Sequence, residues 1–271
     1  MIKLESIPPI YYFNLEHRTD RREYLEKQFS DYGVTNYCRV NSSRYSVDNY
    51  EEWKSKIVID KLRTKIWFLA TLVDRMQGIV DWYNSNISET CLMVEDDICF
   101  EPVKYWNFDW QTFVNRLPCN WECIQLHIIG ERYVNMSLSK WTRNNHSTGC
   151  ILINRSYAEK LIKLHYINDQ FVLYSNYGYN SSWPEYHYQS VDFVLYQIGV
   201  TYSIPIFTTN YTFLSDGLRN KQINHMAKNC DEVVLDWWKN KSTEYTLDDI
   251  FYLNSFKKLE LNLEVNNGLK K

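Results

Sequence analysis

The residues best suited to chemistry in this chain are three consecutive carboxylates, Glu95, Asp96 and Asp97. They follow an apolar run, Thr90–Val94, that has the length and composition of a buried strand. Three adjacent acids repel one another unless a cation or a set of hydrogen-bond donors lies among them. Oxygen ligands favour hard cations such as Mg²⁺ or Mn²⁺, which in turn bind phosphates. The alternative is a solvated acidic turn, and the rest of the sequence has to decide between them.

The composition narrows the classes of function. Of the 271 residues, 45% are hydrophobic, which is enough to form the core of a sizeable α/β domain. The formal net charge of −3 offers no basic footprint, so we do not expect nucleic acid as the main partner. Only 8 glycines are present, and the sequence contains no GxGxxG and no GxxxxGKS or GxxxxGKT. Any bound phosphate would therefore have to be held by a metal ion and basic side chains.

No segment predicts secretion or membrane insertion. Residues 1–9 lack the long apolar core of a signal peptide, and the best apolar run, Ile66–Val73, is far too short to span a bilayer. The seven cysteines show no CxxC spacing. Cys119 and Cys123 have no second Cys or His pair at zinc spacing, so we expect free thiols. These features predict a cytoplasmic protein.

The elements that would position the acids begin with a strand at Ile10–Leu15. A polar turn then leads into a helix, with Asp20 as its N-cap and Glu23 at the capping-box position. A second short strand is expected at Tyr37–Val40. From Lys61 to about Asn84, apolar residues recur every three or four positions, which predicts the longest helix of the chain.

Strands and helices continue to alternate after the acidic segment. The sequence predicts a helix at Trp110–Leu117, strands at Cys123–Ile128 and Gly149–Ile153, a helix at Ser156–His165 capped by Ser156, a short helix at Val191–Ile198, and a strand at Val200–Ile204. Such alternation is typical of an α/β fold with a mostly parallel sheet. We expect one domain over residues 1–240, followed by a charged tail, 241–271, that is compatible with a peripheral helix.

Four stretches carry a resemblance to a known family. They are Ile10–Arg21 (IYYFNLEHRTDR), Val94–Ile98 (VEDDI), Thr148–Leu161 (TGCILINRSYAEKL), and Val191-Asp192 followed by Tyr202–Pro205, with Ser215-Asp216 as a candidate terminal pair. In this order they resemble glycosyltransferase family 25, whose members transfer sugars from nucleotide donors to lipopolysaccharide or to collagen hydroxylysine. The resemblance spans residues 10–216.

The resemblance implies a GT-A fold, a Rossmann-like α/β domain, that uses a UDP-sugar and Mn²⁺ or Mg²⁺. The implied reaction is inverting transfer of a hexose, galactose or glucose, to a glycan, lipopolysaccharide or hydroxylysine-type acceptor. One departure matters: many members carry a Ser-His pair in the helix before the acidic strand, where this chain has Thr71-Leu72. The acceptor chemistry of the family is therefore not carried over in full.

The resemblance implies a different role for each acid of the segment Glu95–Asp97. Asp97 is the first choice as metal ligand. Glu95, two residues earlier on the same strand face, would bind the donor ribose or share the cation. Asp96 points the other way, and we expect it to cap a neighbouring turn. His225 would complete the metal shell by analogy with a late histidine of GT-A enzymes. The alternative for each carboxylate is plain solvation.

Five further residues are candidates for donor binding and proton transfer. Arg18 and Arg21 could contact the diphosphate or the base through their guanidinium groups, or simply be solvated on a helix face. Asn14 could hydrogen-bond uracil, or satisfy a turn. Inverting transfer needs a base for the acceptor hydroxyl, and Asp192 is the first candidate, with a helix N-cap as its alternative role. His127 is the second candidate, with a structural role as the alternative.

Residues 166–188 are rich in aromatic side chains, which suit the apolar faces of sugars. They predict an acceptor-binding loop or, alternatively, a long loop anchored to the core. Two other functional classes remain open: a glycoside hydrolase, for which adjacent acids do not offer a pair flanking a bond, and a degenerate, non-catalytic carbohydrate-binding protein on the same fold.

Overall fold

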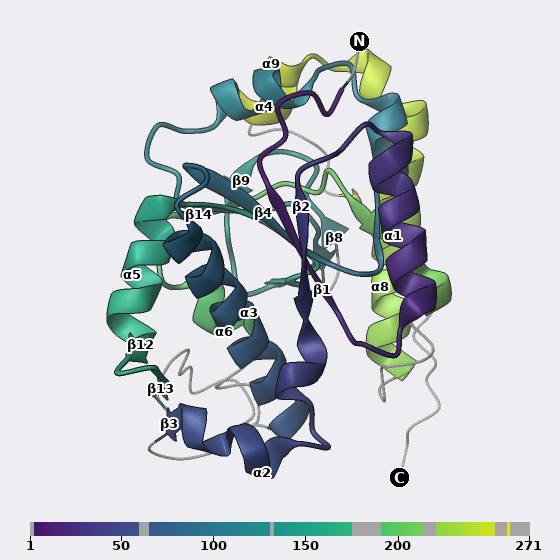
Figure 1. Cartoon of the computed structure of the whole chain (residues 1–271). Helices are drawn as coiled ribbons and strands as arrows, with labels where there is room; N and C mark the ends of the chain where they lie inside the picture. Colours follow the sequence, from purple (N-terminus) through teal and green to yellow (C-terminus); the bar gives the residue numbers. More distant parts are fainter. Residues whose placement is uncertain are drawn as a thin grey trace, which may run out of the picture.

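A seven-stranded sheet runs through the centre of the molecule in the order β2-β1-β4-β11-β6-β14-β9 (Figure 1). The computed structural model describes residues 3–59, 65–130, 133–174, 191–213, 221–252 and 259–260. The strands of the sheet are β1 (Ile10–Asn14), β2 (Tyr37–Asn41), β4 (Thr90–Glu95), β6 (Cys123–Gln125), β9 (Ser139–Lys140), β11 (Cys150–Asn154) and β14 (Thr201–Ser203). The α/β fold expected from the sequence is confirmed.

The sheet is mixed. Strands β2, β1, β4, β6 and β14 share one direction, whereas β11 and β9 run against their neighbours. The expected mostly parallel order is thus interrupted by β11 between β4 and β6. Between β6 and β11 the described chain forms only short strands and no crossover helix. Strand β11 therefore begins beside the carboxyl end of β6. A chain that returns in this way can only run antiparallel.

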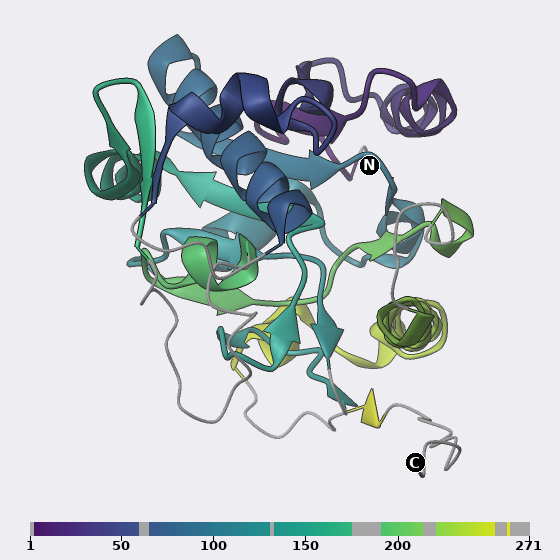
Figure 2. The same ribbon diagram turned by 90° about the horizontal axis from the view of Figure 1, so that it is seen from below.

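Helices cover both faces of the sheet (Figures 1 and 2). One face packs against α1 (Thr19–Asp31) and α8 (Lys221–Asn240). The opposite face packs against α3 (Ile66–Ser85), α5 (Arg155–His165) and α6 (Val191–Tyr196). The remaining α-helices are α2 (Tyr50–Trp53), α4 (Trp110–Arg116) and α9 (Leu247–Tyr252).

Smaller elements complete the chain. They are the strands β3 (Ile57–Ile59), β5 (Ile98–Cys99), β7 (Ile129–Gly130), β8 (Tyr133–Val134), β10 (Asn145–His146), β12 (Tyr166–Ile167), β13 (Gln170–Leu173), β15 (Thr208–Thr209) and β16 (Leu259–Glu260), and the 3₁₀ helices at Ser42–Tyr45, Lys54–Lys56, Glu101–Tyr105, Tyr211–Phe213 and Ser242–Glu244. Strands β5 and β15 pair with each other directly beyond the acidic segment. This pairing fixes the chain on the far side of the acids.

The central strands alternate between two hydrophobic clusters. In β1, Ile10 and Tyr12 belong to the cluster under α1 and α8, whereas Tyr11 and Phe13 belong to the cluster under α3. All four side chains are buried. Because both faces are covered, the strand carries large hydrophobic or aromatic side chains at every position before Asn14, which explains the uninterrupted apolar run in the sequence.

Two predicted helix caps are wrong. The N-cap of α1 is Arg18, and Asp20 lies inside the first turn, where its carboxylate pairs with the Arg18 guanidinium at 2.8 Å. The N-cap of α5 is Asn154, whose side chain accepts from the Tyr157 amide at 2.9 Å. Strand β11 runs directly into α5, so the last strand residue is also the cap. The Ser156 hydroxyl instead donates to Glu122.

The end of the chain is more helical than the sequence reading expected. No helix was predicted over Lys221–Asn240, although Ala227, Cys230, Val234 and Trp238 recur at helical spacing and are all buried. In α9, Leu247, Ile250 and Phe251 pack in the same cluster as α8. A domain boundary at residue 240 remains a prediction.

Several other expectations meet the structure only in part. All seven cysteines are free, as predicted. Within the described ranges, no helix combines the length and apolar character needed to cross a membrane. Of the aromatic segment 166–188, the structure describes the part up to residue 174, and Phe171 in β13 is buried in the core. The rest of that segment, and the pair Ser215-Asp216, lie outside the described residues.

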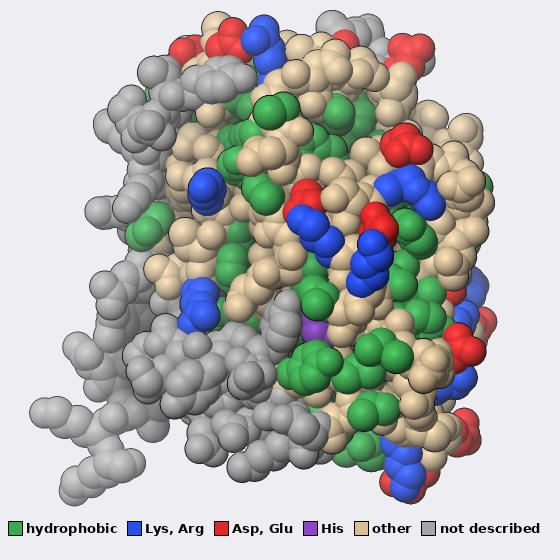
Figure 3. All heavy atoms as spheres, turned by 90° about the vertical axis from the view of Figure 1, so that its left-hand side faces the viewer, with side chains coloured by type: hydrophobic (Ala, Val, Ile, Leu, Met, Phe, Trp, Pro, Cys, Tyr) green, Lys and Arg blue, Asp and Glu red, His purple; other side chains and the backbone are tan. Residues whose placement is uncertain are grey.

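The molecular surface carries charges of both signs. On the face shown in Figure 3, Lys and Arg side chains lie interspersed with Asp and Glu, and some are side by side. Exposed pairs of this kind, such as Lys27–Asp31 at 2.7 Å, contribute at most about 1 kcal/mol each. Buried charges, by contrast, carry large free energies and mark candidate functional groups.

Candidate active site at the carboxyl edge of the sheet

Polar side chains meet where β1 and β4 end. Asn14 is the last residue of β1, Glu95 is the last residue of β4, and Asp96 and Asp97 follow in the turn. Asn14, Asp96 and Asp97 are only 1%, 6% and 5% exposed. The antiparallel strand β11 starts at the same edge, because the Glu95 amide donates to the carbonyl of Gly149 at 2.8 Å. We call this end of the sheet the carboxyl edge.

Arg21, on the first turns of α1, reaches two of the three acids. Its Nη1 lies 2.9 Å from Asp96 Oδ1 and 3.3 Å from Asp97 Oδ2, and its Nη2 donates to the carbonyl of Phe213 at 2.7 Å. The side chain is 14% exposed. From the sequence, Arg21 could contact a diphosphate or be solvated. In the structure its guanidinium group contacts the carboxylates of Asp96 and Asp97 and the carbonyl of Phe213.

Asp96 links β1 and α1 to the acidic turn. Asn14 Nδ2 donates to Asp96 Oδ2 at 2.8 Å and to the Arg18 carbonyl at 3.0 Å, and Asn14 Oδ1 accepts from Arg39 Nε at 3.1 Å. The prediction that Asp96 caps a neighbouring turn is wrong, because its partners are Asn14 and Arg21. Asn14 has no side-chain donor left for a base, because both hydrogens of its amide are engaged.

Glu95 is compensated by the helix on the other face. Arg75, in the middle of α3 and 5% exposed, places Nη2 2.8 Å from Glu95 Oε1. The Thr148 hydroxyl donates to the same oxygen at 3.1 Å, and the Arg75 guanidinium also lies 3.7 Å from the centre of the Phe13 ring. Burial opposes the charged form of Glu95, but Arg75 and Thr148 outweigh burial and lower its pKa.

Asp97 is compensated poorly. Its Oδ1 is buried and has no hydrogen-bond partner among the described residues. Burial and the repulsion of Glu95 and Asp96 outweigh the attraction of Arg21 and raise the pKa of Asp97 to about 7. A buried carboxyl group whose pKa is raised towards neutral pH is a candidate functional group.

The carboxyl edge can accept one cation but does not hold a complete ligand set. Three carboxylates face two guanidinium groups, and the excess charge lies at Asp97. No three His, Cys, Asp or Glu side chains in the described part of the chain come close enough to hold a metal ion together. Asp97, Glu95 and His225 are thus not gathered as one group; His225 lies exposed on α8, with Nε2 3.3 Å from Asn229 Nδ2. Mg²⁺ often binds through one or two carboxylates plus phosphate and water, so the absence of a three-residue cluster among the described residues does not conflict with a site at a single carboxylate such as Asp97.

The two candidate bases lie near each other but in different environments. Asp192, in the first turn of α6, accepts from the Ser147 amide at 2.7 Å. Burial raises the pKa of Asp192 above its ordinary value. His127 follows β6, which ends at Gln125 rather than at Ile128 as predicted, and it is 2% exposed. Its Nδ1 lies 2.6 Å from Ser147 Oγ and its Nε2 lies 3.0 Å from Asp231 Oδ1.

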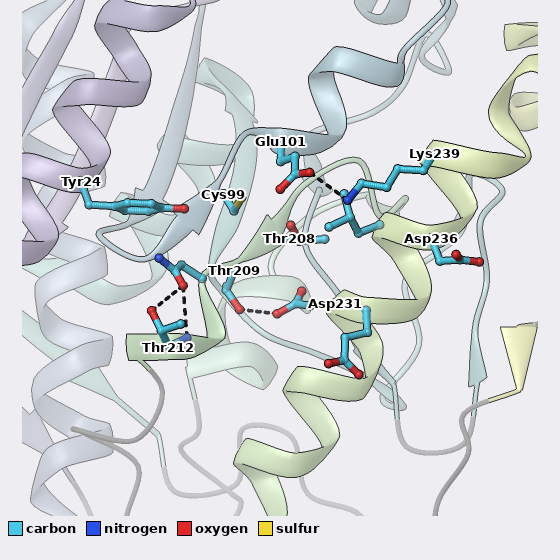
Figure 4. A pocket seen from close by; sticks show the side chains of 12 residues that line it. Tyr24, Cys99, Glu101, Thr208, Thr209, Thr212, Asp231, Asp236 and Lys239 are labelled. Carbon is cyan, nitrogen blue, oxygen red and sulfur yellow. Dashed lines mark hydrogen bonds and ion pairs between the residues drawn. The ribbon is translucent and has the colours of Figure 1, made fainter.

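A pocket of about 530 Å³ lies next to the His127–Asp231 pair, between β5, β15 and α8 (Figure 4). Glu101 and Lys239 form an ion pair at 2.9 Å at one end of it. Asp231 and Thr209 meet at the other end, where the hydroxyl donates to the carboxylate. Asp231 therefore contacts both the pocket and His127.

The sequence reading missed three residues of this region: Arg75, Ser147 and Asp231. Two of them leave a signal in the sequence. Asp74-Arg75 is a charged pair that interrupts the mostly apolar first half of α3, and Asp231 occupies a position on the apolar stripe of α8. Ser147 lies in a polar stretch before β11, and nothing in its residue type indicates the role of its amide.

The arrangement was compared with known proteins. No protein-family model and no curated protein matches the chain. Among solved structures, it is similar to A197 from STIV, with 11% identity, a TM-score of 0.38, and coverage of 74% of this chain and 84% of that chain. It is also similar to the inositol-1-phosphate CTP transferase from T. maritima, with 11% identity, a TM-score of 0.37, and coverage of 83% and 96%. Neither likeness carries an argument about function, so the resemblance to glycosyltransferase family 25 rests on the four sequence stretches.

Proposed function

We propose that this protein is a metal-dependent glycosyltransferase that moves a hexose, galactose or glucose, from a UDP-sugar to a hydroxyl group of a glycan, lipopolysaccharide or hydroxylysine-type acceptor, with inversion. The observation that carries the proposal is Asp97, a buried acid with an unpartnered oxygen at the carboxyl end of a central strand. Ligands of open α/β sheets bind beyond the carboxyl ends of the strands. The ordered sequence motifs supply the reaction class.

Asp97 is the proposed ligand for Mn²⁺ or Mg²⁺. A bound divalent ion would supply positive charge to the diphosphate leaving group without a proton transfer. Asp97 must be ionised to bind it, so the ion and the proton compete for the same oxygen. Arg75 holds Glu95 in place beside this site, where Glu95 would bind the donor ribose or share the ion. His225 stays a proposed further ligand, for which no described contact speaks.

Arg21 and Arg18 are the proposed cations next to the donor diphosphate. Arg21 pairs with Asp96 at 2.9 Å and fixes the turn, so its guanidinium remains at the site without reorganisation. Arg18 lies one turn earlier, and its guanidinium pairs with Asp20. Asn14, for which the sequence left open a hydrogen bond to uracil or the satisfaction of a turn, orients Asp96 in this proposal.

Asp192 is the proposed base that accepts the proton of the acceptor hydroxyl. Its raised pKa brings it nearer to neutral pH, where a general base works best. The groups that act on its charge are His146, which attracts it, and Glu95, which repels it. His127 is less suited to abstract the proton directly, because both of its ring nitrogens already have protein partners.

The direct test is release of UDP from UDP-galactose and UDP-glucose, measured with Mn²⁺, with Mg²⁺ and with EDTA. We expect turnover of at least one donor with metal and none with EDTA. Absence of both turnover and binding for every sugar nucleotide would overturn the proposal. Glycan binding by calorimetry that needs neither UDP nor metal would instead support the degenerate carbohydrate-binding protein.

A further inference from the structure

A buried chain of hydrogen bonds runs from α8 to the carboxyl edge. Asp231 Oδ1 lies 3.0 Å from His127 Nε2, and His127 Nδ1 lies 2.6 Å from Ser147 Oγ. His127 and Asp231 are 2% and 4% exposed, whereas Ser147 is partly exposed. We call Asp231, His127 and Ser147 the relay. A buried polar network in which every member is bonded holds its residues rigidly.

Ser147 has a strained backbone that its neighbours hold in place. Its φ is +98°, a region that residues other than glycine rarely adopt. The Ser147 amide donates to Asp192 Oδ1 at 2.7 Å, its Oγ accepts from the Gly149 amide at 3.0 Å, and its carbonyl accepts from Gln125 Nε2 at 2.9 Å. Strain of this kind persists only where the surroundings over-determine it, and it clusters at functional sites.

Gly149 gives a second and independent sign that the relay is built into the fold. A Cβ at this position would lie 2.7 Å from His127 Nδ1 and 3.2 Å from Ser147 Oγ. Because the imidazole ring is buried, it has no room to move away. Only glycine here allows the imidazole and the serine hydroxyl to meet.

We infer that Asp231 and His127 are positioning residues that act through Ser147 to hold the Asp192 carboxylate in place for proton abstraction. The inference rests on the proposed function, in which Asp192 is the base. In the relay, Asp231 orients the imidazole of His127, the imidazole fixes the Ser147 hydroxyl, and the fixed backbone aims the Ser147 amide at Asp192. A base that is held in the productive geometry loses little rate to misalignment, whereas a shift of about 1 Å can cost 10²-fold.

The relay has the same residue types as a nucleophilic Asp-His-Ser triad, but its surroundings favour the positioning role. Attack by a serine places negative charge on the substrate carbonyl oxygen, and that charge needs donors nearby. The Ser147 amide already donates to the Asp192 carboxylate. The side-chain hydroxyl of the next residue, Thr148, donates to Glu95. Two carboxylates beside Ser147 oppose an oxyanion.

The test compares Ser147→Gly and Asp231→Asn with the wild type. Glycine tolerates the positive φ but removes the hydroxyl, so it breaks the relay without adding strain. Asparagine keeps the shape of Asp231 but not its charge. For both variants we expect kcat to fall about 10- to 100-fold while KM for the UDP-sugar stays within about twofold, because the relay does not touch the donor. Asp236→Asn, an exposed acid on the same helix, is the matched control and should retain the wild-type kcat.

A second readout does not depend on turnover. In protein labelled with ¹⁵N-histidine, Ser147→Gly should shift the Nδ1 resonance of His127, and Asp231→Asn should shift its Nε2 resonance. An active wild type together with a Ser147→Gly variant of unchanged kcat would overturn the relay and leave the proposed function intact. A loss of kcat with an equal loss of donor affinity would mean general structural damage and would also overturn it. A wild type that turns over no sugar nucleotide fails the proposed function itself, whatever the resonances show.

Discussion

Glu95 and Asp97 lie two residues apart at the end of β4, yet the surrounding side chains lower the pKa of one and leave the pKa of the other raised. Glu95 is paired with Arg75 at 2.8 Å, accepts from Thr148, and has a lowered pKa. Asp97 shares Arg21 with Asp96 at the longer distance of 3.3 Å, keeps one oxygen without a described partner, and has a pKa raised to about 7.

The difference distinguishes a carboxylate that protein partners hold in place, Glu95, from one that keeps an oxygen without a described partner, Asp97. A buried charge that lacks a partner costs free energy, so a fold without need for it would pair or replace it. Glu95 is paired and holds β4, α3 and β11 together. In the proposed function, Asp97 binds a cation, which would relieve its uncompensated charge.

The largest expected effect is on catalysis. Asp97→Asn should lower the rate of metal-dependent UDP release about 10³-fold or more, because it removes the proposed metal ligand while keeping the side-chain shape; this corresponds to about 4 kcal/mol of transition-state stabilisation. Steady-state kinetics with saturating Mn²⁺ would measure it. Asp31→Asn, an exposed acid on α1, is the control. An unchanged rate for Asp97→Asn would remove Asp97 from the site.

The next largest expected effect is on the stability of the fold, at the ion pair between Arg75 and Glu95. Arg75→Met removes the cation beside Glu95 and beside the buried Asp74. Because the Glu95 side chain is 34% exposed and water can partly solvate it, the free energy of unfolding should fall by about 2–3 kcal/mol rather than by the full cost of a buried pair, measured by urea denaturation. Arg116→Met, at an ion pair that is about half exposed, should change it by less than about 0.5 kcal/mol.

Removing both partners separates pairing from packing. In the double variant Arg75→Met/Glu95→Gln the charge of Glu95 is gone, whereas the buried Asp74, 3.8 Å from Arg75 in the wild type, still loses its cation, so only part of the lost stability should return. An Arg75→Met variant as stable as the wild type would show that Glu95 is not held by Arg75, and the contrast between the two acids would disappear.

A smaller effect appears in the pH dependence of stability. The folded pKa of Asp97, about 7, lies above its ordinary value of 3.8, so the folded state binds this proton more tightly than the unfolded state. Its contribution to stability is fully present below about pH 4 and is lost as the pH rises through 7. Asp97→Asn cannot titrate. Its stability relative to the wild type should therefore improve between pH 5 and pH 8, by on the order of 2 kcal/mol, in thermal melts. A constant difference across this range would contradict the raised pKa.

The smallest effect refines the Glu95 side. Thr148→Val removes one donor to Glu95 and should cost about 1 kcal/mol, the usual value of one hydrogen bond. Because Thr148 does not touch Asp97, the pH midpoint assigned to Asp97 should stay where it is. A shift of that midpoint would mean that the two acids are coupled more tightly than their separate partners suggest.

The sequence revealed the elements better than the partners of the charges. Apolar runs and helical spacing located β1, β4 and α3, because covered strands and packed helices leave a periodic pattern. The same patterns cannot show strand direction, so the antiparallel β11 was not foreseen. As a result, the approach of Thr148 and Gly149 to Glu95 was not foreseen either.

The candidate site was predictable only as a location. Adjacent acids at a strand end indicated the carboxyl edge. Which of them stays uncompensated depends on Arg21 in α1 and Arg75 in α3, and the sequence does not show which acid each arginine contacts. The pairing of Asp96 with Asn14 and Arg21, rather than with a local turn, follows from the same tertiary contacts. The roles of Asp192, His127 and His225 remain proposals.

The most direct test of the account is calorimetric titration of UDP into the wild type and into Asp97→Asn, each with Mn²⁺ and with EDTA. We expect the wild type to bind UDP at least about tenfold more tightly with Mn²⁺ than with EDTA, and Asp97→Asn to show no such difference. Equal affinity in all four titrations, or no binding in any of them, would contradict the assignment of Asp97 as the anchor of a metal–diphosphate site.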